Sequence, residues 1–181
     1  MTKEIIISGF GGQGIVSSGI ILAHGGLIEN KHVTFFPSYG AEMRGGTANC
    51  SVVISDESVA SPIVASPDVI IIMNEPSLAR FEPALKTQGL LFFNKTLIKS
   101  KPKRTDITII PVEANALAEE LGQGRVANMI MLGAMAKKTG LLSLKTLQKA
   151  QRKRYTKASD DQITLNDKAL EKGYNIFENS R

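Results

Sequence analysis

The chain has 181 residues, of which 43% are hydrophobic and 22% charged, and its formal net charge is +5 at pH 7. This composition is typical of a globular domain and excludes the disordered and fibrous classes. No apolar run approaches the roughly 20 residues of a membrane-spanning helix, and Met1 leads within four residues into an apolar run unlike a signal peptide. We therefore expect a soluble, cytoplasmic protein with no membrane partner.

The first part of the sequence alternates strands with one helix. Short apolar runs predict the strands, and apolar positions at three- and four-residue spacing predict the helix. In chain order we expect a strand at 4–8, a glycine turn at 9–14, a helix at 15–28, a strand at 33–36 closed by Pro37, a glycine-bearing loop at 38–46, and a strand at 47–55. The last strand has Ala48, Cys50, Val52 and Ile54 on one face.

The second part becomes helical toward its end. We expect a strand at 69–73, a helix at 76–86, a strand at 90–93, a basic surface loop at 99–106, a strand at 107–112, and helices at 114–121, 126–138 and 143–155. Ser143 is the expected cap of the third of these helices, and Thr164 or Asn166 caps a last helix that runs through Ile176. The pattern predicts a single domain over residues 1–181 with a helical last third, about 113–178.

Strands that alternate with helices predict an α/β fold with three layers, α/β/α, around a mostly parallel sheet. The glycine turn after the first strand is Rossmann-like. In such sheets ligands bind beyond the carboxyl ends of the strands. The segments 9–14 and 38–46 both follow strands, so we expect them to be neighbours in space.

The turn Gly9-Phe10-Gly11-Gly12-Gln13-Gly14 matches the pattern G-x-G-x-x-G. Such a turn lets a ligand approach the backbone and points N–H groups and a helix dipole at phosphate. A dinucleotide site also needs an acid at the end of the second strand, and residues 33–37 contain none. A Walker loop is excluded because Gly14 is followed by Ile15 and Val16. The turn therefore indicates an anion site, with an NAD(P)-dependent dehydrogenase kept as an alternative.

Arg44 is the cation of the second glycine-bearing loop, beside Gly45 and Gly46. Its guanidinium has the geometry to clamp a phosphate with two hydrogen bonds. An ion pair with Glu42 or with a neighbouring subunit explains the same residue, and the spacing favours neither interpretation.

Two further features limit the function. Cys50 is the only cysteine, so the chain cannot supply the four thiolates of an iron–sulfur cluster, and a small buried hydrophobe is the simplest interpretation of this residue. Ten basic residues lie between Lys137 and Lys172 against four acids, which suits a solvated helix face, a subunit interface or a polyanion. Since Tyr155 is the one aromatic near the basic run 152–154, we expect no nucleic-acid partner, and a nucleic-acid-binding or scaffold protein remains an alternative.

The two glycine segments together are more distinctive than either alone. Gly9 to Gly14 followed by Tyr39-Gly40-Ala41-Glu42-Met43-Arg44-Gly45-Gly46 resembles the γ subunits of 2-oxoacid:ferredoxin oxidoreductases. Further segments similar to that family are Ser61-Pro62, Asn128 through Leu132-Gly133, Asn166-Asp167-Lys168-Ala169 and Gly173-Tyr174. The resemblance extends in order over essentially the whole chain.

The resemblance implies a subunit that has no activity alone. In that family the complete enzyme decarboxylates a 2-oxoacid on thiamine diphosphate, passes electrons through iron–sulfur clusters to ferredoxin, and transfers the acyl group to coenzyme A. Thiamine and the clusters are implied to lie in partner α, β and ferredoxin-like δ subunits, which also determine the 2-oxoacid. The γ-type module is associated with coenzyme A, whose phosphates suit a cationic, glycine-lined crevice.

Carried onto this sequence, the resemblance implies a coenzyme A site with contributions from eight residues. They are Gly11, Gly12, Gln13, Gly14, Ser17, Tyr39, Arg44 and Asn128. Simple turn geometry explains the glycines equally well, and a satisfied buried polar group explains Tyr39 and Asn128. His24 and His32 have no carboxylate at a convincing spacing. We therefore expect no catalytic residue and no metal ligand in this chain.

Overall fold

The computed structural model describes residues 1–40 and 46–178. Its strands form one six-stranded sheet in the order β2-β3-β1-β4-β5-β6. The strands are β1 (Thr2–Phe10), β2 (His32–Tyr39), β3 (Thr47–Ser55), β4 (Val69–Ile72), β5 (Leu90–Asn94) and β6 (Thr108–Val112). Among these described strands, β3 alone is antiparallel to its neighbours β1 and β2, while β1, β4, β5 and β6 are parallel. The mostly parallel α/β sheet is therefore confirmed.

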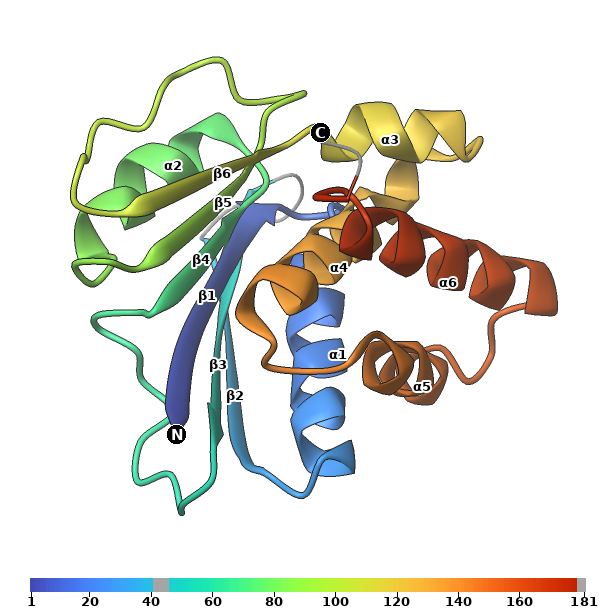
Figure 1. Ribbon diagram of the computed structural model, residues 1–181, viewed down its shortest axis with the longest axis horizontal. Helices are drawn as coiled ribbons and strands as arrows, with labels where there is room; N and C mark the ends of the chain where they lie inside the picture. Colours follow the sequence, from blue (N-terminus) through green and yellow to red (C-terminus); the bar gives the residue numbers. More distant parts are fainter. Residues whose placement is uncertain (41–45, 179–181) are drawn as a thin grey trace.

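Helices cover the two faces of this sheet unequally (Figure 1). One face is covered by α1 (Ile15–Ile28), α3 (Ala114–Glu120), α4 (Ala127–Thr139), α5 (Leu144–Arg154) and α6 (Asp160–Tyr174), and the other by α2 (Glu75–Phe81) and the 3-10 turn η1 (Glu82–Ala84). The 3-10 turn η2 (Gly124–Val126) leads into α4. None of the described helices has both the length and the apolar character needed to cross a membrane.

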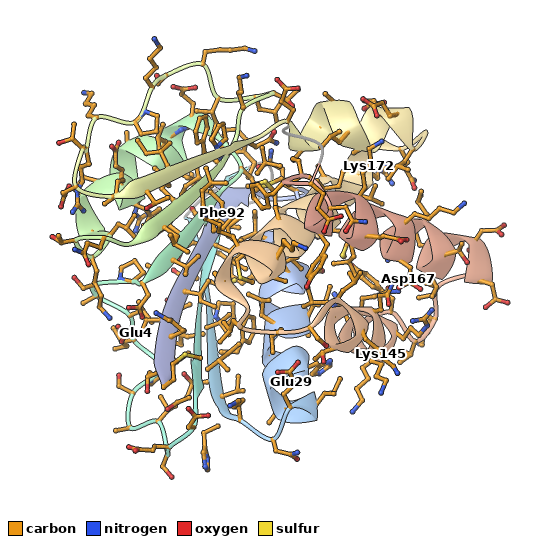
Figure 2. All side chains as sticks on the ribbon, viewed as in Figure 1. Glu4, Glu29, Phe92, Lys145, Asp167 and Lys172 are labelled. Carbon is orange, nitrogen blue, oxygen red and sulfur yellow. The ribbon has the colours of Figure 1, made fainter. Side chains whose placement is uncertain are left out.

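Period-two alternation in the strands divides the core into two clusters. Ile5 and Ile7 of β1 belong to the cluster under α1 and α4, whereas Ile6 belongs to the cluster under α2. The side chain of Phe92 on β5 is fully buried beneath the larger helical layer (Figure 2). The alternating face expected for strand 47–55 is confirmed, because Ala48, Cys50, Val52 and Ile54 all belong to that larger cluster.

Several element boundaries differ from the sequence expectation. Pro37 does not close the second strand: β2 continues to Tyr39, since it is an edge strand and an edge tolerates a proline that donates no ladder bond. The helix expected at 76–86 ends at Phe81 and becomes η1, because Pro83 interrupts the helical hydrogen bonds. Ser143 caps α5 as expected.

The last helix begins earlier than expected. Its cap is neither Thr164 nor Asn166 but Ser159, whose hydroxyl accepts a hydrogen bond from the backbone N–H of Gln162. Asp160 and Asp161 occupy the first turn, where carboxylates favour the helix dipole. Ser159 followed by two aspartates is a recognisable start of a helix, but the apolar residues from which the helix was predicted begin several positions later.

Helices α4 and α6 cross at two glycines. A Cβ atom on Gly133 would collide with the backbone carbonyl of Leu170, and one on Gly173 would collide with the carbonyl of Ile130. The two backbones are therefore in direct contact, and a shift of α6 away from α4 would disturb the packing of its fully buried Ala169 and Leu170.

We expect Gly173→Ala to destabilise the protein despite the better helix propensity of alanine. The propensity gain is about 1 kcal/mol, whereas overpacking against rigid backbone costs about 1–3 kcal/mol or more. Urea unfolding monitored by circular dichroism measures the difference. Lys168→Ala, an exposed position of the same helix, is the matched control and should change stability by less than about 0.5 kcal/mol. A Gly173→Ala variant as stable as wild type would contradict the close crossing.

The thiol of Cys50 is expected to be unreactive in the folded protein. The residue is fully buried, its Sγ donates to the carbonyl of Ile15, and burial raises its pKa to about 12. Because the thiolate is the reactive species, a thiol reagent at pH 8 should modify Cys50 only at the rate of unfolding. Modification within seconds in native buffer, at the rate seen in guanidinium, would show that the thiol is accessible.

Candidate functional site

The glycine turn between β1 and α1 is shaped by left-handed backbone. Gly12 has φ of 94° and Gly14 has φ of 75°, conformations that side-chain-bearing residues rarely adopt. Gly14 is the cap residue of α1, and no side chain caps this helix end. The first N–H groups of α1 therefore lack an intrahelical acceptor and point toward the space beyond the turn. This arrangement favours a bound anion.

Two side-chain amides hold the turn in place. Gln13 accepts a hydrogen bond from the Phe10 N–H at 2.7 Å and donates one to the Met73 carbonyl at 3.1 Å, which ties the turn to the end of β4. Asn128 of α4, 5% exposed, donates to the Gly14 carbonyl at 3.4 Å and to the Ser18 hydroxyl at 3.1 Å. These amides thus brace the backbone that faces the ligand space.

A cavity of about 400 Å³, here called crevice 1, opens beside the turn. Six of the eight residues predicted from the sequence line it: Gly11, Gly12, Gly14, Ser17, Tyr39 and Asn128. Gln13 lines a neighbouring cavity on the other side of the turn. Arg44 lies outside the described residues. Six further lining residues were not among the predicted site residues: Phe10, Ile15, Val16, Ala48, Arg125 and Tyr155.

Two arginines give crevice 1 its positive character. Arg125 of η2 lines the cavity, and Arg154 at the end of α5 donates from Nη2 to the Ser17 hydroxyl at 3.3 Å. The Arg154 Nε is buried and has no hydrogen-bond partner among the described residues. Its guanidinium stacks over the Tyr155 ring at 5.2 Å from the centroid. Within the described chain, neither arginine pairs with an acid.

Helix α5 is fixed against α6 by a buried polar network. Gln151, fully buried, donates to the Ile163 carbonyl at 3.2 Å and to Asp167 at 3.1 Å, while Asn166 donates to Gln151 at 3.1 Å. Arg152 forms an ion pair with the same Asp167, which Figure 2 shows on α6. The network holds the last turn of α5, and hence Arg154 and Tyr155, against the start of α1.

The basic run at the end of α5 is only partly a solvated face. The sequence predicted a surface that faces solvent, a subunit or a polyanion, yet the three residues of the run 152–154 have different surroundings. Arg152 pairs with α6, Lys153 is exposed, and Arg154 turns toward Ser17. Arg154 and Ser17 are 137 residues apart in sequence, so no local pattern relates them.

The two glycine-bearing segments are neighbours where the structure describes them. The Gly11 N–H donates to the Gly46 carbonyl at 2.9 Å, and the Gly40 N–H donates to the Thr47 carbonyl at 2.7 Å. Tyr39 lies at the end of β2 rather than in a loop, 68% exposed, and lines the same cavity as Gly11. The expectation that both segments meet at one edge of the sheet is thus confirmed for these residues.

The sheet order differs from that of a dinucleotide-binding unit. In a dinucleotide-binding unit the strand after the first helix lies beside the first strand and ends in a ribose-binding acid. Here β3 lies between β1 and β2, so the end of β2 is displaced by one strand from the turn. Tyr39 occupies that end.

Neither His24 nor His32 lines either cavity, and no group of three or more potential metal ligands occurs in the described part of the chain.

Comparison with known proteins gives relatives in two length classes. The chain is 40% identical over 171 residues to ketoisovalerate oxidoreductase subunit VorA of Methanothermobacter marburgensis, covering 94% of the chain but 35% of VorA. It is 34% identical over 179 residues to 2-oxoglutarate synthase subunit KorC of Methanocaldococcus jannaschii, covering 97% of the chain and 94% of KorC. The chain thus spans about a third of VorA and nearly all of KorC.

Solved structures share the fold. The γ subunit of a keto/oxoacid ferredoxin oxidoreductase from Geobacter sulfurreducens matches with a TM-score of 0.80 and 28% identity, covering 95% of this chain and 96% of that one. A 2-oxoglutarate:ferredoxin oxidoreductase from Magnetococcus marinus, determined with 2-oxoglutarate, coenzyme A and succinyl-CoA bound, matches with a TM-score of 0.89 and 23% identity, covering 98% of this chain and 31% of that one.

A family model matches nearly the whole chain. The family model described as pyruvate ferredoxin/flavodoxin oxidoreductase matches residues 4–176, which include the glycine turn, crevice 1 and all four helices after β6. By this match and by the near full-length likeness to KorC, the chain belongs to the pyruvate ferredoxin/flavodoxin oxidoreductase family.

Proposed function

We propose that this chain is the cluster-free γ subunit of a thiamine-dependent 2-oxoacid:ferredoxin oxidoreductase, and that crevice 1 binds the nucleotide half of coenzyme A. One combination of features supports this ligand: the start of α1 has no side-chain cap, and two arginines beside it, Arg125 and Arg154, form no ion pair with an acid among the described residues. A protein of the same fold contains bound coenzyme A.

The groups around crevice 1 suit the parts of that nucleotide. Backbone N–H groups of the turn and the positive end of α1 favour the pyrophosphate. Arg154 and the Ser17 hydroxyl, 3.3 Å apart, form a paired donor set for the 3′-phosphate. Tyr39 at the end of β2 and Tyr155 at the end of α5 both line the cavity, and their aromatic rings suit the adenine. Arg44 remains a sequence-based candidate for closing the crevice.

The redox chemistry is assigned to partner subunits. The overall reaction releases carbon dioxide from a 2-oxoacid, passes two electrons singly to ferredoxin, and joins the acyl group to the coenzyme A thiol. Thiamine diphosphate supplies the carbanion chemistry, and iron–sulfur clusters supply the electron path. This chain has one cysteine, which is fully buried. Its own contribution is to bind and orient the acyl acceptor.

Relatives of different length support a role inside a larger assembly. VorA and the Magnetococcus enzyme contain this module as about a third of one longer chain. A protein named as a common γ subunit of pyruvate and ketoisovalerate oxidoreductases in Thermococcus kodakarensis is 32% identical over 180 residues and almost equal in length. We infer α, β and ferredoxin-like δ chains as the partners of this one.

Arg154→Ala and Arg125→Ala should each raise the apparent KM for coenzyme A in the assembled enzyme. Loss of a charge-assisted hydrogen bond corresponds to about 1–3 kcal/mol, or roughly 5- to 150-fold. Steady-state ferredoxin reduction with varied coenzyme A measures the effect, and the KM for the 2-oxoacid should not change. Lys153→Ala, the exposed neighbour of Arg154, is the control. Equal changes in both KM values would indicate a structural role instead.

Binding should discriminate between coenzyme A and NAD(P). Isothermal titration of the assembly that co-purifies with this chain should show binding of coenzyme A and no binding of NAD or NADP at the same concentrations, because the end of β2 supplies no ribose-binding acid. Binding of NAD without coenzyme A would overturn the proposed function. So would the absence of any thiamine-binding partner among the co-purifying chains.

A further inference from the structure

A second cavity lies on the other side of the glycine turn and is not explained by the nucleotide. This cavity, crevice 2, measures about 460 Å³ and is bounded by Gly12 and Gln13 after β1, Met73 after β4, and residues of α3 and η2. The chain leaves β1 toward β2 on one side of the sheet and reaches β4 on the other. Crevice 2 is therefore at the switch point of the sheet, where α/β proteins most often bind ligands.

Crevices 1 and 2 adjoin each other. Gly12 and Arg125 line both of them, so a ligand that extends past these two residues could occupy both cavities. Gly12 has no side chain, and a Cβ there would meet no atom of the described residues within 4 Å. The described residues therefore leave space beside the backbone at Gly12.

The chemistry of crevice 2 differs from that of crevice 1. Its lining includes the amides of Asn115 and Gln123 and the carboxylate of Glu119, whereas none of the described residues that line crevice 1 is an acid. Asn115 is oriented by fully buried Asn94, whose Nδ2 donates to the Asn115 Oδ1 at 2.7 Å. The NH₂ group of Asn115 is left as the donor on the crevice side, 3.8 Å from the Cβ position of Gly124.

We propose that crevice 2 is the subsite for a neutral, amide-bearing arm, the pantetheine portion of coenzyme A. This inference rests on the proposed function of crevice 1. Asn115 and Gln123 match the two amide groups of such an arm, and Glu119 accepts from its N–H or O–H groups. A cavity of about 400 Å³ is near the lower end of ligand-site volumes, and coenzyme A needs the second cavity as well.

Charge determines which end of the ligand enters which crevice. Glu119 repels phosphate from crevice 2, while Arg125 at the junction and Arg154, which is hydrogen-bonded to Ser17 of crevice 1, attract it. The pyrophosphate is then at the junction, the nucleotide in crevice 1 and the arm in crevice 2. A second phosphate group or a dinucleotide in crevice 2 is disfavoured for the same reason.

The test compares coenzyme A with its nucleotide half, adenosine 3′-phosphate 5′-diphosphate, in the assembly that co-purifies with this chain. Gln123→Trp fills crevice 2 from a half-exposed position whose side chain has no hydrogen bond within the described structure. We expect the Kd for coenzyme A to rise at least tenfold and the Kd for the nucleotide half to remain within twofold. Arg154→Ala should weaken both ligands.

A second variant tests the same subsite without changing its shape. Asn115→Asp keeps the oxygen that accepts from Asn94 but replaces the NH₂ donor, and it should weaken coenzyme A while leaving the nucleotide half unchanged. If both variants bind coenzyme A as wild type does, or if the two ligands weaken equally, the subsite is refuted while crevice 1 stands. If wild type fails to bind the nucleotide half, the proposed function of crevice 1 is refuted and the subsite with it.

Discussion

The short turn between β1 and α1 is the constraint on which the rest of the site depends. Its left-handed glycines expose backbone N–H groups at the start of α1, and the amides of Gln13 and Asn128 hold that backbone from two sides. The donors for the proposed anion are therefore already oriented, and its binding would require little ordering of the protein. Both crevices are defined by this one segment, since Gly12 lines each of them.

The helices after β6 add polar, cationic and aromatic side chains to the surroundings of the glycine turn. Helix α4 supplies Asn128, and the turn before it supplies Arg125. Helix α5 brings Arg154 and Tyr155 to the start of α1, because the network around Gln151 and Asp167 locks it to α6. The close glycine crossing of α4 and α6 completes this support. The packing of these helices therefore determines where Arg125 and Arg154 lie relative to the turn.

The difference in length among relatives is consistent with a module that works at a boundary between chains. Where the module is part of a longer chain, as in VorA, its neighbours are held covalently. In the separate subunit that we propose, the same neighbours bind through surfaces. The proposed acyl acceptor in crevices 1 and 2 is then presented to a reaction centre on another chain.

The sequence by itself determined the type and order of the helices and strands and the position of the glycine turn, because local periodicity and glycine content act over a few residues. Helix 15–28 and the buried face of strand 47–55 follow from such patterns. Tertiary structure alone decided that β3 separates β1 from β2, that Gln13 and Asn128 brace the turn, and that Arg125, Arg154 and Tyr155 surround it. Those contacts join segments far apart in the sequence, 60 residues for Gln13 and Met73 and 137 for Arg154 and Ser17, and only the packing of helices and strands brings such segments together.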